Sequence, residues 1–223
     1  MPTQSERTVH EDFPGATAFV PKTSSLTRLA SAARQCRGCD LYQHATQTVF
    51  GSGPKNAPMA LIGEQPGDVE DREGQPFVGP AGRVLDRALA ELGLDRSTVY
   101  LTNVVKHFRW RSTDRGTRRI HQKPDSRHIE ACTPWLQAEL RVVQPKVLVA
   151  LGAVAAQHLL GRSVRVTKSR GAVLPWPPDS SAADQHIVAT IHPSAVLRSD
   201  DREAAFAGFV ADLAVAVKAV DMT

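Results

Sequence analysis

The chain has 223 residues, of which 42% are hydrophobic and 22% are charged, and its net charge is +4. These values are typical of an ordinary globular protein, and the length suits one α/β domain of about 200 residues. The longest uncharged apolar run has about ten residues, half the length of a membrane helix, and the N-terminal residues lack the apolar core of a signal peptide. We therefore expect a cytoplasmic monomer, neither secreted nor embedded in a membrane.

Predicted helices and strands alternate along the first half of the chain. Residues 1–23 show no periodic pattern and are predicted to form a disordered or loosely packed tail. A serine-capped helix is expected over 26–35 and a buried strand over 57–63. A second helix follows over 80–92, and a strand rich in β-branched residues over 98–105.

The chain contains three cysteines, namely Cys36, Cys39 and Cys132. An odd number without a secretion signal argues against a disulfide framework, and the C-x-x-C spacing of the first two is typical of metal ligation. A redox C-x-x-C is expected between a strand and a helix, whereas this pair precedes the first predicted strand. The cysteines are therefore interpreted as ligands, and their residue type is compatible with both zinc and an iron–sulfur cluster.

The second half of the chain begins with a basic segment. Residues 106–127 contain eight basic and two acidic side chains, a net charge of +6, which is typical of a phosphate-binding surface and also of a solvated loop. The segment has no regular pattern and is predicted to be irregular. The elements expected after it are a helix from Ser126 that Pro134 kinks or restarts, a strand over 146–151, a short helix to about Leu160, a small hairpin over 164–174, a strand over 186–191 and a last helix.

Alternating strands and helices predict an α/β fold. We expect one three-layer domain over 24–220, with a central four-stranded, mostly parallel sheet flanked by helices and a basic loop inserted at about 108–125. Such sheets bind ligands at the carboxyl ends of their strands. Polar clusters follow three of the predicted strands at that end: GEQPGD (63–68), Asn103 and HPS (192–194).

Four ordered motifs resemble the uracil-DNA glycosylase superfamily: GEQPGD (63–68), PFVGPAGR (76–83), TNVVK (102–106) and HPS (192–194). The resemblance covers about residues 26–218 and implies a glycosylase-like fold that excises uracil from single- or double-stranded DNA. The cysteines point to the iron–sulfur branch. The sequence RRIH (118–121) is similar to the UdgX type, whose members become covalently attached to their DNA substrate.

The resemblance implies a 4Fe–4S cluster held by Cys36, Cys39, His107 and Cys132. Related glycosylases generally have a cysteine directly after NVVK, where this chain has His107. Three thiolates and an imidazole are an equally good ligand set for structural Zn²⁺. Only the resemblance favours iron.

The resemblance also implies the residues of a uracil pocket. Phe77 is expected to stack on a uracil that has left the DNA helix, although an apolar PFVG sequence also suits a plain core position. Asn103 carries a donor and an acceptor that match uracil N3–H and O4, and it would reject cytosine. His192 is expected to bind uracil O2, and backbone N–H groups near Gln65 and Asp68 to add donors.

Two further residues are expected in the reaction centre. Glu64 is expected to stabilise the sugar cation, to activate water or to polarise His121. The resemblance to the RRIH loop makes His121 the nucleophile that bonds to C1′ of the sugar after uracil leaves.

DNA binding is assigned to Arg118, Arg119 and Ser194, and Leu197 is a candidate wedge for the space left by the flipped base. Two other functions remain open from the sequence. One is a recycling glycosylase that releases free abasic sites. The other is a metal-stabilised DNA-binding module without catalysis, which would not need Glu64, Asn103 and His192 on three strand ends.

Overall fold

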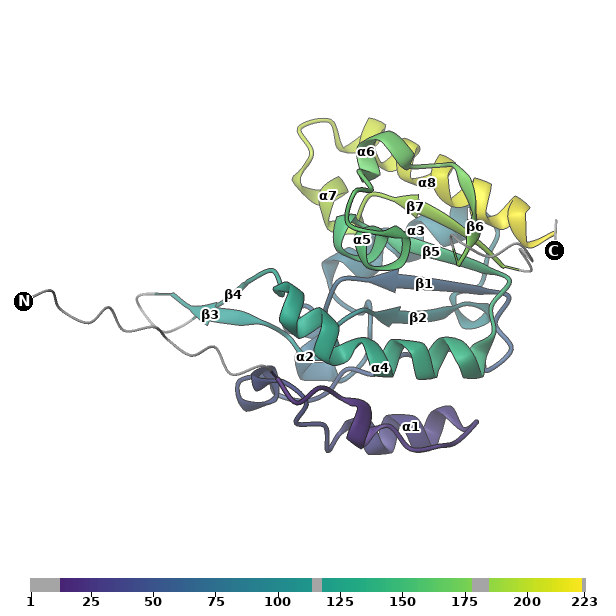
Figure 1. The fold of residues 1–223 in the computed structure, drawn as a ribbon. Coiled ribbons are helices and arrows are strands. Elements are labelled where there is room, and N and C mark those ends of the chain that lie inside the picture. Colours follow the sequence, from purple (N-terminus) through teal and green to yellow (C-terminus); the bar gives the residue numbers. More distant parts are fainter. Residues whose placement is uncertain (1–12, 114–117, 178–184, 222–223) are drawn as a thin grey trace, which may run out of the picture.

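The computed structural model describes residues 13–113, 118–177 and 185–221 (Figure 1). A five-stranded sheet in the order β2-β1-β5-β7-β6 forms the middle layer. Its bounds are β1 Met59–Gly63, β2 Tyr100–Asn103, β5 Val147–Leu151, β6 Val173–Trp176 and β7 Gln185–Thr190. The three-layer α/β prediction is confirmed, and β2, β1, β5 and β7 are the four expected parallel strands.

The predicted strand count was one too low. Strand β6 runs antiparallel to β7 at the edge of the sheet, with Val173 opposite Val188. The predicted local hairpin over 164–174 is therefore wrong, because β6 pairs with a strand that follows it, and α6 (Val166–Ser169) occupies the start of that range. Pro175 fits an edge strand, where its missing N–H breaks no ladder hydrogen bond.

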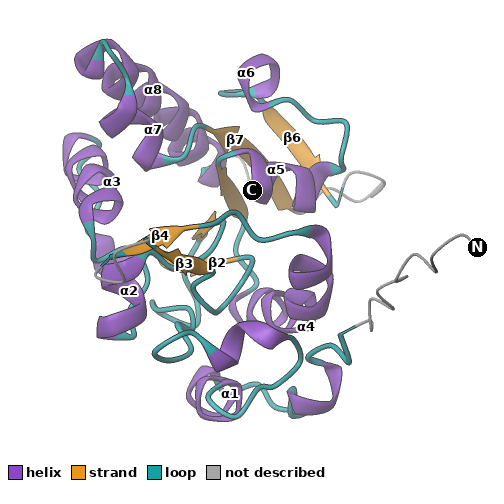
Figure 2. Ribbon diagram, turned by 90° about the vertical axis from the view of Figure 1, so that its left-hand side faces the viewer, coloured by secondary structure: helices purple, strands orange, loops and turns teal. Residues whose placement is uncertain are grey.

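Helices cover both faces of the sheet (Figures 1 and 2). One face packs against α3 (Pro80–Glu91), α7 (Pro193–Arg198) and α8 (Arg202–Val220). The other packs against α1 (Leu26–Ala33), α4 (Ser126–Val143) and α5 (Ala153–Leu160). Each strand contributes to both hydrophobic cores, because neighbouring side chains point to opposite faces of the sheet. In β5, Val147 and Val149 belong to the core under α3, α7 and α8, and Leu148 belongs to the core under α1, α4 and α5.

Helix α4 does not break at its proline. It runs from Ser126 to Val143 as one α-helix that includes Pro134, so the expected restart is wrong. Cys132, Trp135 and Leu136 on either side of the proline are all buried, and their packing holds the helix together. Asp125 caps the N-terminus by accepting from the backbone of Arg127 and His128.

Two segments expected to be irregular are ordered. Residues 13–23 of the predicted loose tail pack against the core: Ala16 is 1% exposed, and its N–H donates to the Ala131 carbonyl. Residues 1–12 lie outside the described residues. The basic segment forms a β-hairpin of β3 (Trp110–Ser112) and β4 (Arg119–His121), whose residues 114–117 are not described.

The remaining elements are short. They are α2 (Asp68–Glu73) and the 3₁₀ helices Thr17–Phe19, Asp40–Gln43 and Arg96–Thr98. Within the described ranges, no helix is both long and apolar enough to cross a membrane.

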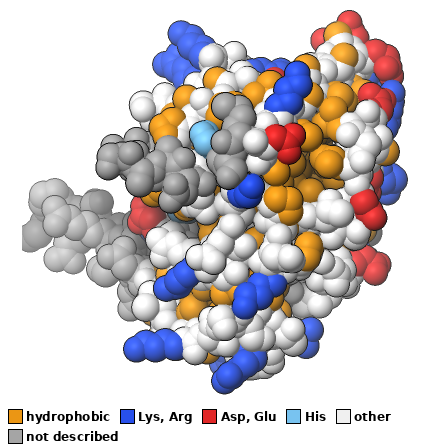
Figure 3. Space-filling view, turned by 90° about the vertical axis from the view of Figure 1, so that its right-hand side faces the viewer, with side chains coloured by type: hydrophobic (Ala, Val, Ile, Leu, Met, Phe, Trp, Pro, Cys, Tyr) orange, Lys and Arg blue, Asp and Glu red, His pale blue; other side chains and the backbone are white. Residues whose placement is uncertain are grey.

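The amino ends of the strands carry an apolar surface. Hydrophobic side chains gather on this face of the molecule (Figure 3). An open groove lies there between α4, α5 and β6, and its lining includes Leu140, His158 and Trp176. The groove is at the opposite end of the sheet from the three sequence motifs.

Candidate active site and metal centre

The carboxyl ends of β1, β2 and β7 bring the predicted pocket residues together. Gly63 ends β1 opposite Asn103 at the end of β2, and His192 follows β7. A Cβ atom at Gly63 would lie 2.3 Å from Asn103 Oδ1 and 2.7 Å from Phe77 Cζ, so only glycine fits between them. The rings of Phe77 and His192 are stacked with centroids 6.2 Å apart.

Phe77 adopts an unusual backbone conformation in this pocket. Its φ is 55°, in the left-handed region that a bulky residue rarely adopts, and its side chain is 4% exposed. Gly82 of α3 permits this turn, since a Cβ there would lie 1.9 Å from the Phe77 carbonyl oxygen. A strained residue held by its surroundings often marks a binding site.

His192 is held as a neutral imidazole. Its Nδ1 accepts the Ser194 backbone N–H at 3.2 Å and lies 2.8 Å from Ser194 Oγ, which in turn accepts from Arg198 at 3.0 Å. Burial, together with the positive charge of Arg198, lowers the pKa of His192 to about 4. The proton of the neutral ring is therefore assigned to Nε2, which is left free to donate.

Glu64 and His121 face each other. His121 Nε2 lies 3.6 Å from Glu64 Oε1, an oxygen that is buried and has no hydrogen-bond partner among the described residues. Burial raises the pKa of Glu64 above its ordinary value despite nearby Lys123 and Arg198. Burial and Arg198 lower the pKa of His121, whose side chain is still 51% exposed. The imidazole is thus neutral at neutral pH and accessible.

Gln65 fixes the base of the hairpin that carries His121. Its Nε2 donates to the carbonyls of Arg109 and Gln122, both at 3.1 Å, and its Oε1 accepts the Arg109 N–H at 3.2 Å. The side chain is 6% exposed. Its polar atoms are therefore used within the protein, which leaves only its backbone for the expected contact with uracil.

Arg119 also holds the hairpin in place. Its guanidinium pairs with Asp68 and, at 2.6 Å, with Asp71, and it lies over the rings of Phe108 and Trp110. Arg119 was expected to bind DNA phosphate. In the structure its positive charge is already paired with two carboxylates. Asp68, expected at the uracil, is one of these partners.

Other predicted DNA-binding residues have different surroundings. Arg118 is exposed and remains available to phosphate. The Ser194 hydroxyl is engaged with His192 and Arg198, as described above. Leu197, the candidate wedge, is half-buried on α7.

Arg198 is a site residue that the sequence motifs did not indicate. Its charge acts on Glu64, His121 and His192 together. Its position four residues after Ser194, on the same face of a helix, was the available signal.

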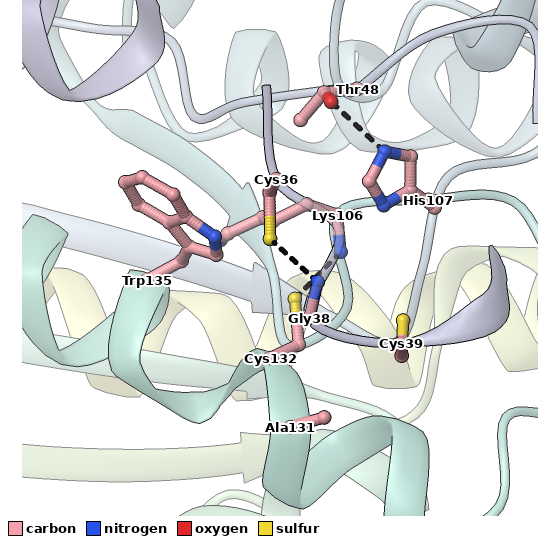
Figure 4. Close-up of a pocket in the computed structure, with 9 residues that line it drawn as sticks. All are labelled: Cys36, Gly38, Cys39, Thr48, Lys106, His107, Ala131, Cys132 and Trp135. Carbon is pink, nitrogen blue, oxygen red and sulfur yellow. Dashed lines mark hydrogen bonds between the residues drawn. The ribbon is translucent and has the colours of Figure 1, made fainter. Parts of the chain in front are cut away.

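The four predicted metal ligands line one small cavity (Figure 4). Cys36 and Cys39 come from the loop after α1, His107 from the segment after β2 and Cys132 from α4. The Gly38 N–H donates to Cys36 Sγ at 3.5 Å, and a second backbone N–H donates to Cys132 Sγ at 3.3 Å. Such donors are typical of metal-bound thiolates.

The buried thiols require a positive partner to ionise. Burial raises the pKa of Cys39 to about 11 and that of Cys132 to about 12. A thiolate is the form that binds metal, and a bound cation offsets the cost of burying it.

His107 offers one free nitrogen to the cavity. The Thr48 hydroxyl donates to the Ala33 carbonyl at 3.1 Å, so its oxygen accepts a hydrogen bond from His107 Nε2–H, with Nε2 2.9 Å away. Nδ1 then carries the lone pair, and Figure 4 shows it on the side away from Thr48. Burial lowers the pKa of His107 to about 4, which keeps the ring neutral as a ligand requires.

Two observations test how well the cavity fits a metal group. Trp135 is fully buried, and its Nε1, which Figure 4 shows turned toward the cavity, has no hydrogen-bond partner among the described residues. In the described part of the chain, no three His, Cys, Asp or Glu side chains are close enough to bind one metal ion. The indole N–H without a partner fits a group that supplies a hydrogen-bond acceptor, whereas the described side chains do not by themselves form a site for a metal ion.

Comparisons with known proteins identify the family of this chain. The family model of the uracil DNA glycosylase superfamily matches residues 50–214. A type-4 uracil-DNA glycosylase from Thermotoga maritima is 35% identical over 171 residues, which cover 76% of this chain and 82% of the relative. Proteins of the same name from Sulfurisphaera tokodaii and Archaeoglobus fulgidus are 33% identical, covering 78% of this chain and 76% and 83% of the relatives. The chain therefore belongs to the uracil DNA glycosylase superfamily.

Proposed function

We propose that this protein is a uracil-DNA glycosylase of the UdgX type, which excises uracil and then bonds to C1′ of the abasic sugar through His121. The excision activity is supported by relatives named type-4 uracil-DNA glycosylase and by the pocket of Phe77, Asn103 and His192. The observation that carries the trapping step is the 3.6 Å distance between His121 Nε2 and Glu64 Oε1, at the rim of that pocket.

Bond breaking requires a flipped base and a stabilised leaving group. Phe77 stacks on the uracil, and the Asn103 amide pairs with N3–H and O4. The electron pair of the C1′–N1 bond leaves with uracil and places negative charge on O2. The neutral His192 ring donates to O2 through Nε2–H, in a site from which water is largely excluded.

The sugar cation forms beside Glu64. The unpartnered Oε1 atom retains its full capacity to stabilise a positive charge, as carboxylates do in sugar hydrolysis. His121 Nε2 lies next to the same oxygen and is therefore near the electrophilic carbon. Its lone pair forms the bond to C1′, and the alkylated ring then loses the Nδ1 proton to solvent.

We propose that Cys36, Cys39, His107 and Cys132 hold a 4Fe–4S cluster with a structural role. The support is the set of four donors that line one cavity, together with the resemblance of the chain to the iron–sulfur branch of the family. A bound cluster would join the N-terminal loop, helix α4 and the segment leading into the hairpin.

A uracil-containing oligonucleotide tests the proposal. The wild-type protein should form a band that survives a denaturing gel. His121→Ser should lose this band and release abasic sites that alkali cleaves, because none of the residues that break the bond is changed. His158→Ser, in the distant groove, should behave as wild type.

The other outcomes identify the competing functions. Free abasic sites without a covalent band from the wild type would indicate a recycling glycosylase. Binding without either product would indicate a non-catalytic DNA-binding module. A covalent band that persists in His121→Ser would assign the bond to another residue.

A further inference from the structure

Lys106 lies between the metal cavity and the uracil pocket and is almost fully buried, with 1% of its side chain exposed. Its backbone N–H donates to Cys132 Sγ at 3.3 Å, and Lys106 lines the metal cavity (Figure 4). Its Nζ donates at 2.6 Å to the backbone carbonyl of Asn103. One residue therefore contacts both a metal ligand and the residue proposed to read uracil.

A buried network holds the Lys106 ammonium in place. Nζ lies 2.5 Å from Oε2 of Glu139, whose side chain is 0% exposed, and donates to Thr102 Oγ1 at 2.8 Å. The hydroxyls of Tyr100 and Thr102 donate to the Glu139 carboxylate at 3.0 Å. In a low-dielectric interior a fully partnered network is rigid, because displacing one member leaves a buried charge without its partner.

We propose that Lys106 is a positioning residue that couples the metal centre to uracil recognition by Asn103. The inference rests on the proposed function, since it requires a metal at Cys132 and uracil at Asn103. A metal on Cys132 Sγ fixes the sulfur that accepts the Lys106 N–H. The ammonium carries that constraint to the Asn103 carbonyl and so to the end of β2, where the amide must face the base.

Thermodynamic linkage makes such a coupling reciprocal. If the metal centre orients Asn103, uracil bound at Asn103 must in turn stabilise the metal centre. Because the site must open before iron can leave, we expect this stabilisation to slow the loss of iron. The probe is an oligonucleotide with one 2′-fluoro-2′-deoxyuridine, whose electron-withdrawing fluorine resists cleavage. The measurement is the rate at which the holoprotein loses iron to a ferrous chelator. We expect release to be about tenfold slower with this DNA than with a thymine oligonucleotide of equal length, both saturating.

A neutral double variant tests the residue itself. Lys106→Met with Glu139→Gln removes both charges and leaves none buried alone. We expect it to retain iron, to lose iron equally fast with both oligonucleotides, and to lose about tenfold of its preference for the uracil analogue. Tyr100→Phe is the matched control, because it removes one hydroxyl from Glu139 without touching Lys106 or Asn103, and should retain both effects.

The outcomes separate this inference from the proposed function. Equal iron release with the two oligonucleotides in the wild type overturns the coupling, even if the double variant does not fold. If the double variant still loses iron more slowly with the uracil analogue than with thymine DNA, the role of Lys106 is overturned. Wild-type protein without iron refutes the proposed cofactor, and iron-containing protein without preference for the analogue refutes the proposed recognition; either result also removes the basis of the coupling.

Discussion

Replacing Arg119 should affect stability far more than replacing its neighbour Arg118. The Arg119 side chain is 15% exposed and pairs with Asp71, which is 0% exposed. Arg119→Ala leaves that carboxylate buried, and among the described residues the Thr46 backbone N–H, at 3.0 Å, is its remaining hydrogen-bond donor. Removing one partner of a buried pair costs about 3–5 kcal/mol, and this remaining contact places the expected loss near ~3 kcal/mol. Arg118→Ala should change stability by less than about 0.5 kcal/mol.

Urea unfolding of the two variants measures the difference directly. Adding Asp71→Asn to the Arg119 variant should recover part of the loss, because the second change removes the unpaired charge. Binding to a uracil-free oligonucleotide across a salt series then separates anchoring from phosphate contact. Arg118→Ala should flatten the slope of log affinity against log salt by about 0.7–0.9, and folded Arg119→Ala should leave it nearly unchanged.

One pattern of results would refute this reasoning. If Arg119→Ala is as stable as Arg118→Ala and both flatten the salt slope equally, Arg119 is a phosphate ligand. DNA phosphate would then replace Asp68 and Asp71 as the partners of Arg119.

Three further predictions concern the cofactor, the hairpin and pH. Trp135→Phe should lower the reduction potential of the proposed metal centre by about 20–60 mV, which corresponds to the loss of one N–H···S hydrogen bond of about 0.5–1.5 kcal/mol. The control Trp176→Phe should leave the potential unchanged. Equal potentials in wild type and Trp135→Phe would exclude the indole as a donor. Gln65→Ala should release the base of the hairpin and yield free abasic sites beside the covalent band; trapping as complete as in wild type would contradict this. As the pH is lowered, the rate of excision should begin to fall while the pH is still above 4.5, because the pKa of Glu64 is raised and the carboxylate is protonated early. Trapping by neutral His121 should persist below pH 6.5, because the pKa of this histidine is lowered. A midpoint for trapping above pH 6.5 would contradict the lowered pKa of His121.

Folding stability should follow the protonation of His192. Because its pKa is lowered to about 4 in the folded protein and is near 6.5 in an unfolded chain, the unfolded state binds more protons between these values. Its contribution to stability is complete above pH 6.5 and is lost as the pH falls toward 4. His192→Gln should therefore unfold with a weaker pH dependence over this range.

The sequence predicted the elements whose signals are local. The parallel strands are short apolar runs, and the polar motifs that end them mark the rim of the sheet. Strand β6 gave no such signal, since its residues are mostly half-buried and include Pro175. The hairpin strands were hidden because each has only three residues and includes an arginine, Arg111 in β3 and Arg119 in β4.

Contacts between distant segments could not be predicted in this way. The packing of Ala16 on α4 depends on a residue 115 positions away, Ala131. The basic pattern around Arg119 indicated phosphate binding, because the sequence does not show that this arginine pairs with Asp68 and Asp71 in α2. A charge count shows where cations are, but only the fold shows which of them are already paired.

The proposed trapping step requires that the hairpin hold His121 firmly in place. After uracil leaves, water at about 55 M competes with an imidazole whose effective concentration reaches ~10⁵ M when it is well positioned, an advantage of about 10³. That advantage exists only if the entropy of positioning is lost before the reaction. Gln65 directly follows Glu64 in the chain and bonds to the backbone of Gln122, which directly follows His121. The carboxylate proposed to favour the sugar cation and the proposed nucleophile are therefore fixed to each other through one buried amide. The proposed trapping would then follow from this anchorage and would not require an unusually reactive histidine.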